Sequence, residues 1–352
     1  TAALNYGGNP ASRLTTTVSY DGTNWSAESA MATARSMGGG SPSGTTGAAL
    51  ASTGSPGTAT EEFSLTIYSP IAATWASTTS TPSPSAYSSG ASGGTPTAGF
   101  MAGGFSPPNA VTNATLNFDG SSWTSSGNLG ASKGRMNLGV SGTQTAGLSV
   151  GGYTPGSLTS VEEYDGSNWT GGGALPTATQ QSGGAGPQTS YMMLGTDSDR
   201  SEGLSYNGSA WGAEGSSSQG FAYGALAGQE TAALAFYGAT SPAGTSRSTG
   251  EEYNGTAWTT VVPSLPDQGS SGSAGGTSTA SVFAGSNATA RYWDGTTVAA
   301  TASMAVSTRG NFYAIGNSAN GFLAVNGSPA NHSVEQYNAE QQALNTKTLT
   351  SS

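Results

Sequence analysis

The sequence predicts an all-β protein that is built from a repeated unit of short antiparallel strands. In the clearest unit, residues 145–169, an apolar run ends in a glycine pair, a second run ends in Tyr164, and Asp165-Gly166 precedes Trp169. Adjacent Asp and Gly suit a type I′ hairpin turn, because both central positions need positive φ. Such units recur about every 40 to 50 residues, the period of a four-stranded propeller blade. We therefore predict a β-propeller of four-stranded antiparallel blades.

Eight units can be traced along the 352 residues, and we expect them to form a single domain. Their approximate bounds are 1–34, 35–84, 85–130, 131–177, 178–217, 218–267, 268–307 and 308–352. Eight blades are favoured, with seven as the alternative if one unit lies outside the ring. Second and third strands occur in all eight units, but only seven inner strands are clear. We therefore expect the C-terminal strand Ala343–Thr350 to close the ring against the first blade.

Aromatic residues recur at fixed places in the units. A single small sheet cannot cover a tryptophan, so each of these side chains should pack against a neighbouring blade. In the seventh unit the tryptophan shifts to Trp293, and Val298 stands where the aromatic residue after the turn is expected. The aromatic residues with this structural role are Tyr20, Trp25, Trp75, Phe118, Trp123, Tyr164, Trp169, Tyr206, Trp211, Tyr253, Trp258 and Trp293.

Composition excludes several classes of function. The chain has 9 basic and 19 acidic residues, a net charge of −10, and no basic cluster, so nucleic acid is not an expected partner. No cysteine is present, which excludes disulfides and thiolate metal sites. No apolar run is long enough to cross a membrane as a helix, so membrane insertion is not expected.

The repeat resembles the kelch repeat. The resemblance rests on the glycine pair that closes the second strand, on the Tyr or Phe followed about five residues later by Trp, and on arginines such as Arg35, Arg135 and Arg309 before the inner strands. It implies a kelch-like β-propeller. The Gly/Ser/Thr-rich wording of the repeats is also similar to kelch-repeat virion structural proteins of marine tailed phages.

That second resemblance implies a virion or extracellular location and a role in a tail or on a capsid. The implied partners are other virion proteins and a host-surface glycan or receptor, and the chain could be multimeric in the assembly. A carbohydrate-binding propeller without catalysis is the alternative, and a glycan-active enzyme is the third hypothesis.

The inventory of reactive residues favours a protein that is not an enzyme. The copper oxidases of kelch-like fold need a cysteine-modified tyrosine and histidine ligands, whereas this chain has no Cys and a single His. Neighbouring strand residues point to opposite faces, so Glu162-Glu163 and Glu251-Glu252 cannot flank one glycosidic bond. Arginines that recur at one repeat position form a spaced ring rather than a cluster. We predict no catalytic residue, no cofactor and no metal.

Function should then depend on exposed loops. The connections between second and third strands are long and varied, and they share one face of a propeller with the connections between blades. Phe105, Tyr153 and Arg200 lie in such loops and are our candidates for surface contacts. Exposed aromatic rings suit stacking on sugars or on partner side chains.

Overall fold

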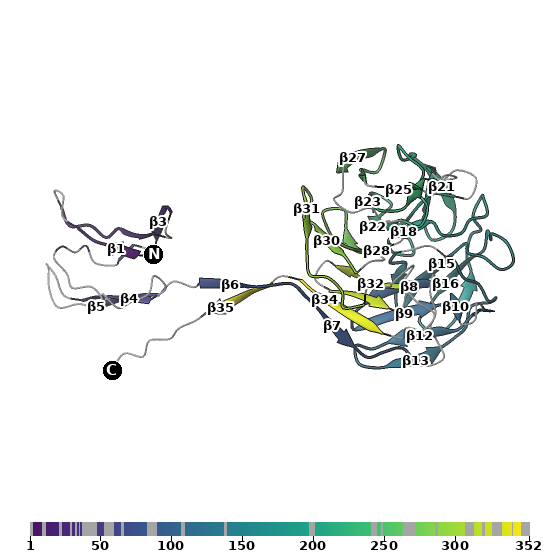
Figure 1. Cartoon of the computed structure of the whole chain (residues 1–352), viewed down its shortest axis with the longest axis horizontal. Coiled ribbons are helices and arrows are strands. Elements are labelled where there is room, and N and C mark those ends of the chain that lie inside the picture. The colour runs from purple at the N-terminus through teal and green to yellow at the C-terminus, as the bar shows by residue number, and fades with distance from the viewer. Residues whose placement is uncertain are drawn as a thin grey trace. The chain divides into compact units, whose positions relative to one another are not determined.

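The computed structural model of the chain forms two compact units (Figure 1). We call Thr1–Ile71 with Glu340–Ser352 the N-terminal unit, and Ala72–Ala339 the propeller unit. The structure describes residues 3–8, 12–20, 23–28, 30–31, 34, 36, 48–52, 60–64, 67–82, 90–106, 110–136, 139–196, 201–240, 245–247, 249–262, 272–285, 288–306, 313–318, 321–325, 333–339 and 341–345.

The propeller unit consists of six four-stranded antiparallel sheets, each forming one blade. The first blade has β8 (Ala91–Thr95), β9 (Ala98–Ala102), β12 (Thr115–Phe118) and β13 (Trp123–Ser126). The second has β14 (Gly142–Thr143), β15 (Ala146–Val150), β16 (Val161–Tyr164) and β17 (Trp169–Gly171), and the third has β18 (Gly183–Ala185), β19 (Tyr191–Leu194), β20 (Gly203–Tyr206) and β21 (Trp211–Glu214). The fourth has β22 (Ala225–Gln229), β23 (Ala232–Phe236), β26 (Gly250–Tyr253) and β27 (Trp258–Val262), and the fifth has β28 (Gly272–Thr277), β29 (Ala280–Gly285), β30 (Ala290–Trp293) and β31 (Val298–Ala300). The sixth has β32 (Tyr313–Ser318), β33 (Gly321–Val325), β34 (Val334–Asn338) and β7 (Thr74–Thr78).

Two short ribbons lie in loops of the propeller unit. These are β10 (Phe105–Ser106) with β11 (Ala110–Val111), and β24 (Ala239–Thr240) with β25 (Thr245–Ser246). Figure 1 shows inner strands such as β8, β22, β28 and β32 toward the middle of the ring, and outer strands such as β7, β13, β27 and β31 toward its rim. The predicted propeller of four-stranded antiparallel blades is therefore confirmed.

The turn after the third strand differs from the type I′ turn that we predicted. Tyr164 pairs with Trp169, so four residues form the loop. Gly166 has a φ of 100°, but Asp165 is not among the described residues with positive φ. The Asp165 carboxylate instead accepts hydrogen bonds from the backbone N–H groups of Ser167 (2.8 Å) and Asn168 (2.7 Å). Asp suits this position because its side chain caps the loop. Gly suits the next position because its backbone adopts positive φ without strain.

The hydrophobic core lies between neighbouring blades, as the repeat predicts. One cluster joins Leu148 and Val161 of the second blade to Tyr191 and Tyr206 of the third, all of them buried. The other clusters of the propeller unit have the same arrangement. Because each blade buries its face only against the next, the ring must close for every blade to be covered.

Each outer-strand tryptophan contacts the blade that precedes it in the ring. The indole N–H groups of Trp123, Trp169 and Trp211 donate hydrogen bonds to the Thr79 carbonyl, the Thr115 hydroxyl and the Gly173 carbonyl at 3.0, 2.9 and 2.9 Å. Trp75 donates in the same way to the Ala302 carbonyl at 2.8 Å. These tryptophans therefore join neighbouring blades.

The predicted number of blades, eight with seven as the alternative, is wrong. The ring has six blades, and it is closed by β7, which pairs with β34 in the register Tyr337 to Trp75. The same register joins Tyr164 to Trp169, so Trp75 supplies the tryptophan that the last repeat lacks. A strand from the start of the propeller unit thus completes its last blade.

The predicted closure by Ala343–Thr350 is also wrong. Residues 343–345 belong to β35 (Gln341–Asn345), which pairs with β6 (Ile67–Ile71) in a two-stranded ribbon. Residues 346–350 lie outside the described part of the chain. The closing strand of the ring is β7, on the N-terminal side of the propeller unit.

The N-terminal unit holds the first repeat and residues 35–71 of the second, and none of their described strands belongs to the six blades. The rest of the second repeat supplies β7 to the sixth blade. The N-terminal unit contains a three-stranded sheet of β1 (Ala3–Tyr6), β2 (Thr17–Tyr20) and β3 (Trp25–Glu28). It also contains a hairpin of β4 (Ala48–Ser52) and β5 (Thr60–Ser64).

The seventh repeat confirms the predicted shift of its aromatic residue. Trp293 pairs with Val298, so Trp293 stands in the place of Tyr164 and Val298 in the place of Trp169. Trp293 is buried, and its indole N–H donates to the Ser278 carbonyl at 2.7 Å.

Candidate functional site

Antiparallel blades place two kinds of connection on one face of the ring. These are the loops from second to third strands and the linkers between blades, and we call this side the loop face. Gly103 and Gly151 end second strands with φ of 67° and 58°. A Cβ at Gly151 would lie 2.6 Å from the Thr179 carbonyl oxygen, and one at Gly103 would lie 2.8 Å from that of Lys133. The glycine pairs therefore let each linker pack directly on the preceding strand end.

Three successive linkers carry a residue in the left-handed conformation at the equivalent place. Arg135, Gln181 and Tyr223 have φ of 51°, 56° and 59°. Their backbones form a chain, in which the Gln181 N–H donates to the Arg135 carbonyl (2.7 Å) and the Tyr223 N–H donates to the Gln181 carbonyl (2.9 Å). Residues other than glycine adopt this conformation at a cost, and such residues are frequent at binding sites.

Arg135 joins two aromatic side chains on the loop face. Its guanidinium carbon lies 4.9 Å from the centre of the Tyr153 ring and 5.6 Å from that of the Phe105 ring. Both distances are in the range of cation–π contacts. The backbones of Gly134 and Tyr153 exchange hydrogen bonds of 2.7 and 3.2 Å, which fixes the arginine beside the tyrosine. All three side chains are half-buried, so part of each faces solvent.

Two polar side chains extend this group. Arg135 donates to the Gln180 amide oxygen at 3.3 Å, and the Gln180 amide nitrogen donates to the Ser157 hydroxyl at 3.1 Å. We call Phe105, Arg135, Tyr153, Ser157 and Gln180 the loop-face cluster. It combines a fixed cation, two aromatic rings, an amide and a hydroxyl from four different connections of the ring.

A buried ion pair supports the linker that carries Arg135. Lys133 Nζ lies 3.0 Å from a carboxylate oxygen of Glu162, whose second oxygen accepts from the Gly130 N–H at 2.7 Å. The Lys133 side chain is 1% exposed. Burial lowers the pKa of Lys133, and the charge of Glu162 opposes that shift. This pair anchors the linker and leaves Glu162 bonded on both oxygens.

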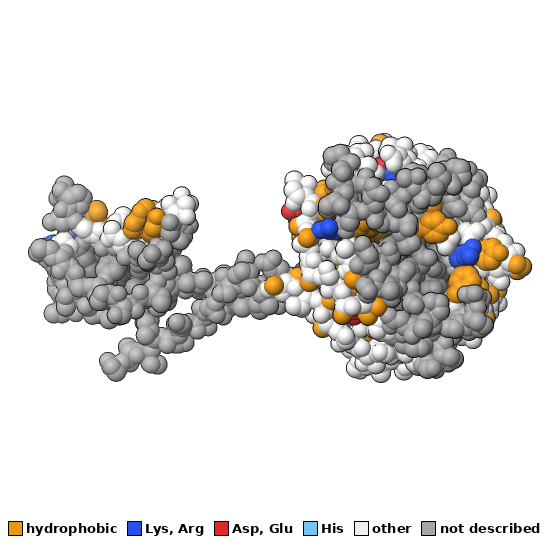
Figure 2. Space-filling model, in the orientation of Figure 1, with side chains coloured by type: hydrophobic (Ala, Val, Ile, Leu, Met, Phe, Trp, Pro, Cys, Tyr) orange, Lys and Arg blue, Asp and Glu red, His pale blue; other side chains and the backbone are white. Residues whose placement is uncertain are grey.

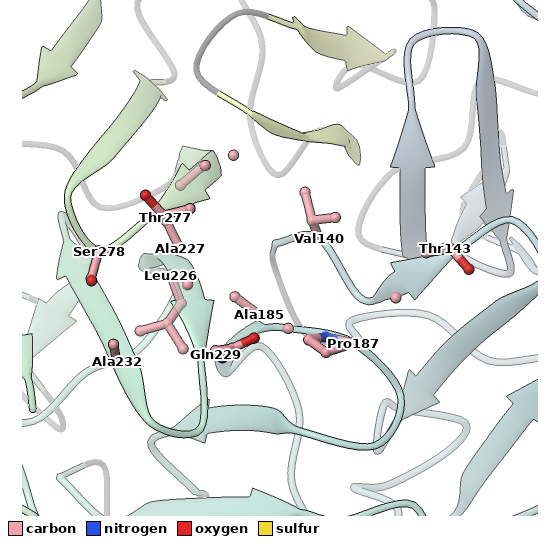
Figure 3. A pocket seen from close by; sticks show the side chains of 16 residues that line it. Val140, Thr143, Ala185, Pro187, Leu226, Ala227, Gln229, Ala232, Thr277 and Ser278 are labelled. Carbon is pink, nitrogen blue, oxygen red and sulfur yellow. The ribbon is translucent and has the colours of Figure 1, made fainter. Parts of the chain in front are cut away.

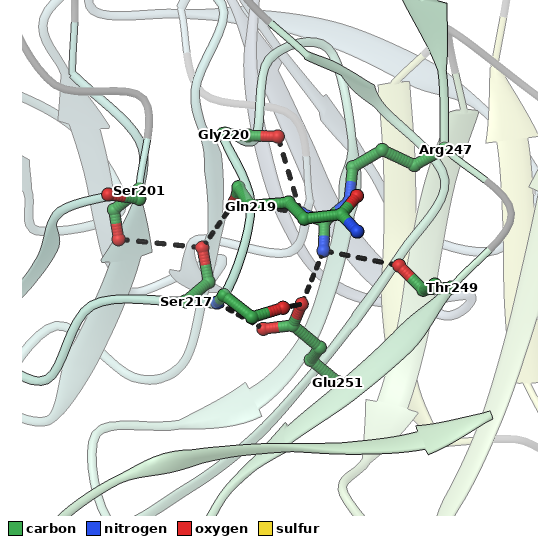
Figure 4. A network of polar contacts seen from close by, with 8 residues as sticks. Ser201, Ser217, Gln219, Gly220, Arg247, Thr249 and Glu251 are labelled. Carbon is green, nitrogen blue, oxygen red and sulfur yellow. Dashed lines mark hydrogen bonds and ion pairs between the residues drawn. The ribbon is translucent and has the colours of Figure 1, made fainter. Parts of the chain in front are cut away.

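A second buried pair has the same role in the fourth blade (Figure 4). Arg247 lies 2.6 Å from Glu251, and their side chains are 1% and 0% exposed. Arg247 also donates to the Gln219 carbonyl at 3.3 Å, and Glu251 accepts from the Ser218 N–H at 3.0 Å. Burial lowers the pKa of Arg247, which Glu251 counteracts. The pair ties a second-to-third-strand loop to the linker that precedes its blade.

Other carboxylates bond to tyrosines of the next blade. Tyr206 and Tyr253 donate to Glu163 and Glu214, each at 2.6 Å. Burial, followed by the bond to Glu214, raises the pKa of Tyr253 to about 12. Glu162 therefore contacts the linker before its blade and Glu163 contacts the next blade, in keeping with the alternation of strand residues.

A cavity of about 390 Å³ lies at the opposite end of the inner strands (Figure 3). It is lined by the turns between first and second strands and by apolar residues such as Val140, Ala185 and Leu226. Gln229 and Thr277 add polar groups, and none of the described residues that line it is charged. This cavity is separate from the loop-face cluster.

The structure brings together two of the three candidate contact residues. Phe105 and Tyr153 lie on either side of Arg135, whereas Arg200 is outside the described part of the chain. Arg35 and Arg309, which we grouped with Arg135, are also outside it. Gln180 was not predicted, because only its position in a linker marks it and its bond to Arg135 depends on the fold.

Within the described ranges, no three His, Asp or Glu side chains come together as they would around a metal ion. The same ranges contain no helix that is long and apolar enough to cross a membrane.

Comparison with known proteins shows the fold alone. No family model matches the chain, and no curated protein matches it. The chain is similar to a solved structure that is described as "Structure of YjhT", with a TM-score of 0.59 and 15% identity. The match covers 76% of this chain and 99% of that one. The resemblance to kelch repeats and to phage proteins remains a prediction.

Proposed function

We propose that this protein is a non-enzymatic structural protein of a phage virion, where its propeller serves assembly or host-surface attachment through the loop-face cluster. The observation that carries this proposal is the position of Arg135 between Phe105 and Tyr153. Such a group, held by three connections of a closed ring, presents a rigid contact surface. Arginine and tyrosine are enriched among the residues that dominate binding energy at protein interfaces.

The carboxylates support a role other than catalysis. Glu162 and Glu251 neutralise buried cations, and Glu163 and Glu214 accept bonds from tyrosines. A general acid or base must be able to reach a substrate proton. Carboxylates that are bonded in this way hold blades and linkers together instead.

The low charge of the surface also suits a durable shape in an assembly. Only 8% of the residues are charged, and few of the side chains that Figure 2 colours by type are blue or red. The virion location itself rests on the similarity of the repeats to those of marine phage proteins. Within the virion, we place the protein on a tail or on the capsid surface.

Purified phage particles test this proposal. The chain should co-purify with particles at a constant ratio, and recombinant full-length chain should bind either particle proteins or host cells. Arg135→Ala should weaken that binding at least tenfold, whereas Arg291→Ala, a change on β30 outside the loop-face cluster, should not. A chain that is absent from particles, or that binds equally well without Arg135, would refute the proposal.

A carbohydrate-binding propeller is the second candidate. The loop-face cluster favours it, because aromatic rings stack on sugars while an arginine, an amide and a hydroxyl supply hydrogen bonds to their hydroxyl groups. A glycan array with the full-length chain should then show a defined set of bound glycans, and Tyr153→Ala should abolish the signal. An array without binding would exclude this candidate.

A further inference from the structure

The N-terminal unit exposes a tryptophan that the propeller unit covers at the equivalent positions. Trp25 pairs with Tyr20 in the same register as Trp258 with Tyr253. The ring centres are 5.1 Å apart at 34° in the first pair, and 5.2 Å apart at 34° in the second. Yet Trp25 is 56% exposed. It is the one large hydrophobic side chain in the described part of the chain that is exposed to solvent.

The propeller unit shows what covers this position. Trp123, Trp169 and Trp211 each donate their indole N–H to the preceding blade. An exposed apolar surface of this kind marks an interaction site. The surface that fits it is therefore a blade of the same repeat.

Among the described strands, the sheet that carries Trp25 ends at its inner edge with β1. In every blade of the propeller unit, the second strand pairs on one side with an inner strand and on the other with the third strand. In the N-terminal unit, β1 stands in the place of the second strand, and the described strands provide no inner partner for it. An edge strand of this kind can pair with another strand.

The β4–β5 hairpin belongs to a second incomplete blade. Ala49 pairs with Phe63, and Ala51 pairs with Glu61. This matches the pairing of Ala233 with Tyr253 and of Ala235 with Glu251 in the fourth blade. The N-terminal unit thus carries the second and third strands of two blades.

We propose that the N-terminal unit is an interface between copies of this chain, in which Trp25 packs on a blade of a neighbouring copy and three copies together close a ring of six blades. Six blades of this repeat make one full turn in the propeller unit, so two blades from each chain supply a third of a turn. A head-to-tail interface whose rotation closes forms a ring rather than a filament. Each copy carries both surfaces that such a contact requires.

Sedimentation velocity of the full-length chain over a concentration series tests this proposal. The wild-type protein should sediment with three times the mass of one chain. Trp25→Ala should shift it to the mass of one chain, and Ala27→Arg should do the same by placing a charge on the Trp25 face of β3. Ala27 is exposed, so this variant removes no core group. The matched control is Arg135→Ala, which changes the loop face of the propeller unit and should remain trimeric.

Circular dichroism should show an unchanged melting transition of the propeller unit in both interface variants. A wild-type chain that stays monomeric at its solubility limit, or that stops at a dimer, would overturn the proposal. A trimer that persists in both Trp25→Ala and Ala27→Arg, or that Arg135→Ala dissociates, would overturn it as well.

Discussion

The buried pair of Arg247 and Glu251 allows a sharp test of how the blades are held to their linkers. We consider Glu251→Gln, which keeps the shape of the side chain and removes its charge. The Glu251 carboxylate accepts from Arg247 at 2.6 Å and from the Ser218 N–H at 3.0 Å, and its side chain is fully buried. Glutamine replaces one accepting oxygen with an amide that donates, so at least one of these donors loses its partner.

The expected loss in free energy of unfolding follows from the burial of Arg247. With 1% of its side chain exposed, Arg247 cannot recover the lost interaction from water. Leaving one member of a buried ion pair uncompensated costs about 3–5 kcal/mol. Total stabilities of domains are about 5–15 kcal/mol, so the variant should lose a large share of its free energy of unfolding.

Urea unfolding at neutral pH, followed by tryptophan fluorescence, measures this loss. The matched control is Glu252→Gln, which changes the neighbouring, half-buried carboxylate on the other face of β26 and should cost less than about 0.5 kcal/mol. If the two variants have equal midpoints and slopes, Glu251 does not compensate a buried charge and the reasoning is wrong.

Three further predictions concern the blade contacts. Tyr253→Phe removes the bond to Glu214 and should lower the free energy of unfolding by about 1.5–3 kcal/mol at pH 7. Folding raises the pKa of Tyr253 from 10.0 to about 12. The extra free energy of unfolding of the wild type is therefore complete below pH 10 and is lost as pH rises through about 12. Urea midpoints measured across that range would reveal this loss. Trp75→Ala should cost about 3 kcal/mol by thermal or urea unfolding, and an unchanged stability would contradict closure of the ring by β7. Backbone hydrogen bonds lower the pKa of Asp165, so its contribution is present above its ordinary pKa of 3.8 and is lost as pH falls below it. Asp165→Asn should flatten that acid dependence in pH-dependent melting curves, since Asn207 caps the same turn in the third blade.

Much of the blade structure could be predicted from local sequence, because the signals are local. A capping residue, a glycine with positive φ and a pair of aromatic residues lie within about six positions of each other, although Tyr164 pairs with Trp169 across a four-residue loop and not across the predicted type I′ turn. The number of blades could not be predicted in this way. Trp75 pairs with Tyr337 across most of the chain, and the repeat around Trp25 has the same local pattern although it lies outside the ring.

The candidate site also contains residues that the sequence could identify and a contact that depends on the fold. Phe105 and Tyr153 could be selected because they are aromatic and lie in long loops. The place of Arg135 between them could not, since it depends on a left-handed backbone and on the packing of a linker against two strand ends. The sequence indicated only that this arginine recurs at one repeat position.

A cryo-EM map of the native phage particle tests the proposed function most directly. We predict that the six-bladed ring is found on the tail or capsid surface, with Arg135, Phe105 and Tyr153 against a virion protein or free to meet the host. A native chain that occurs only as a soluble protein away from particles, or a ring whose loop-face cluster is covered by its own neighbouring residues, would contradict the proposal.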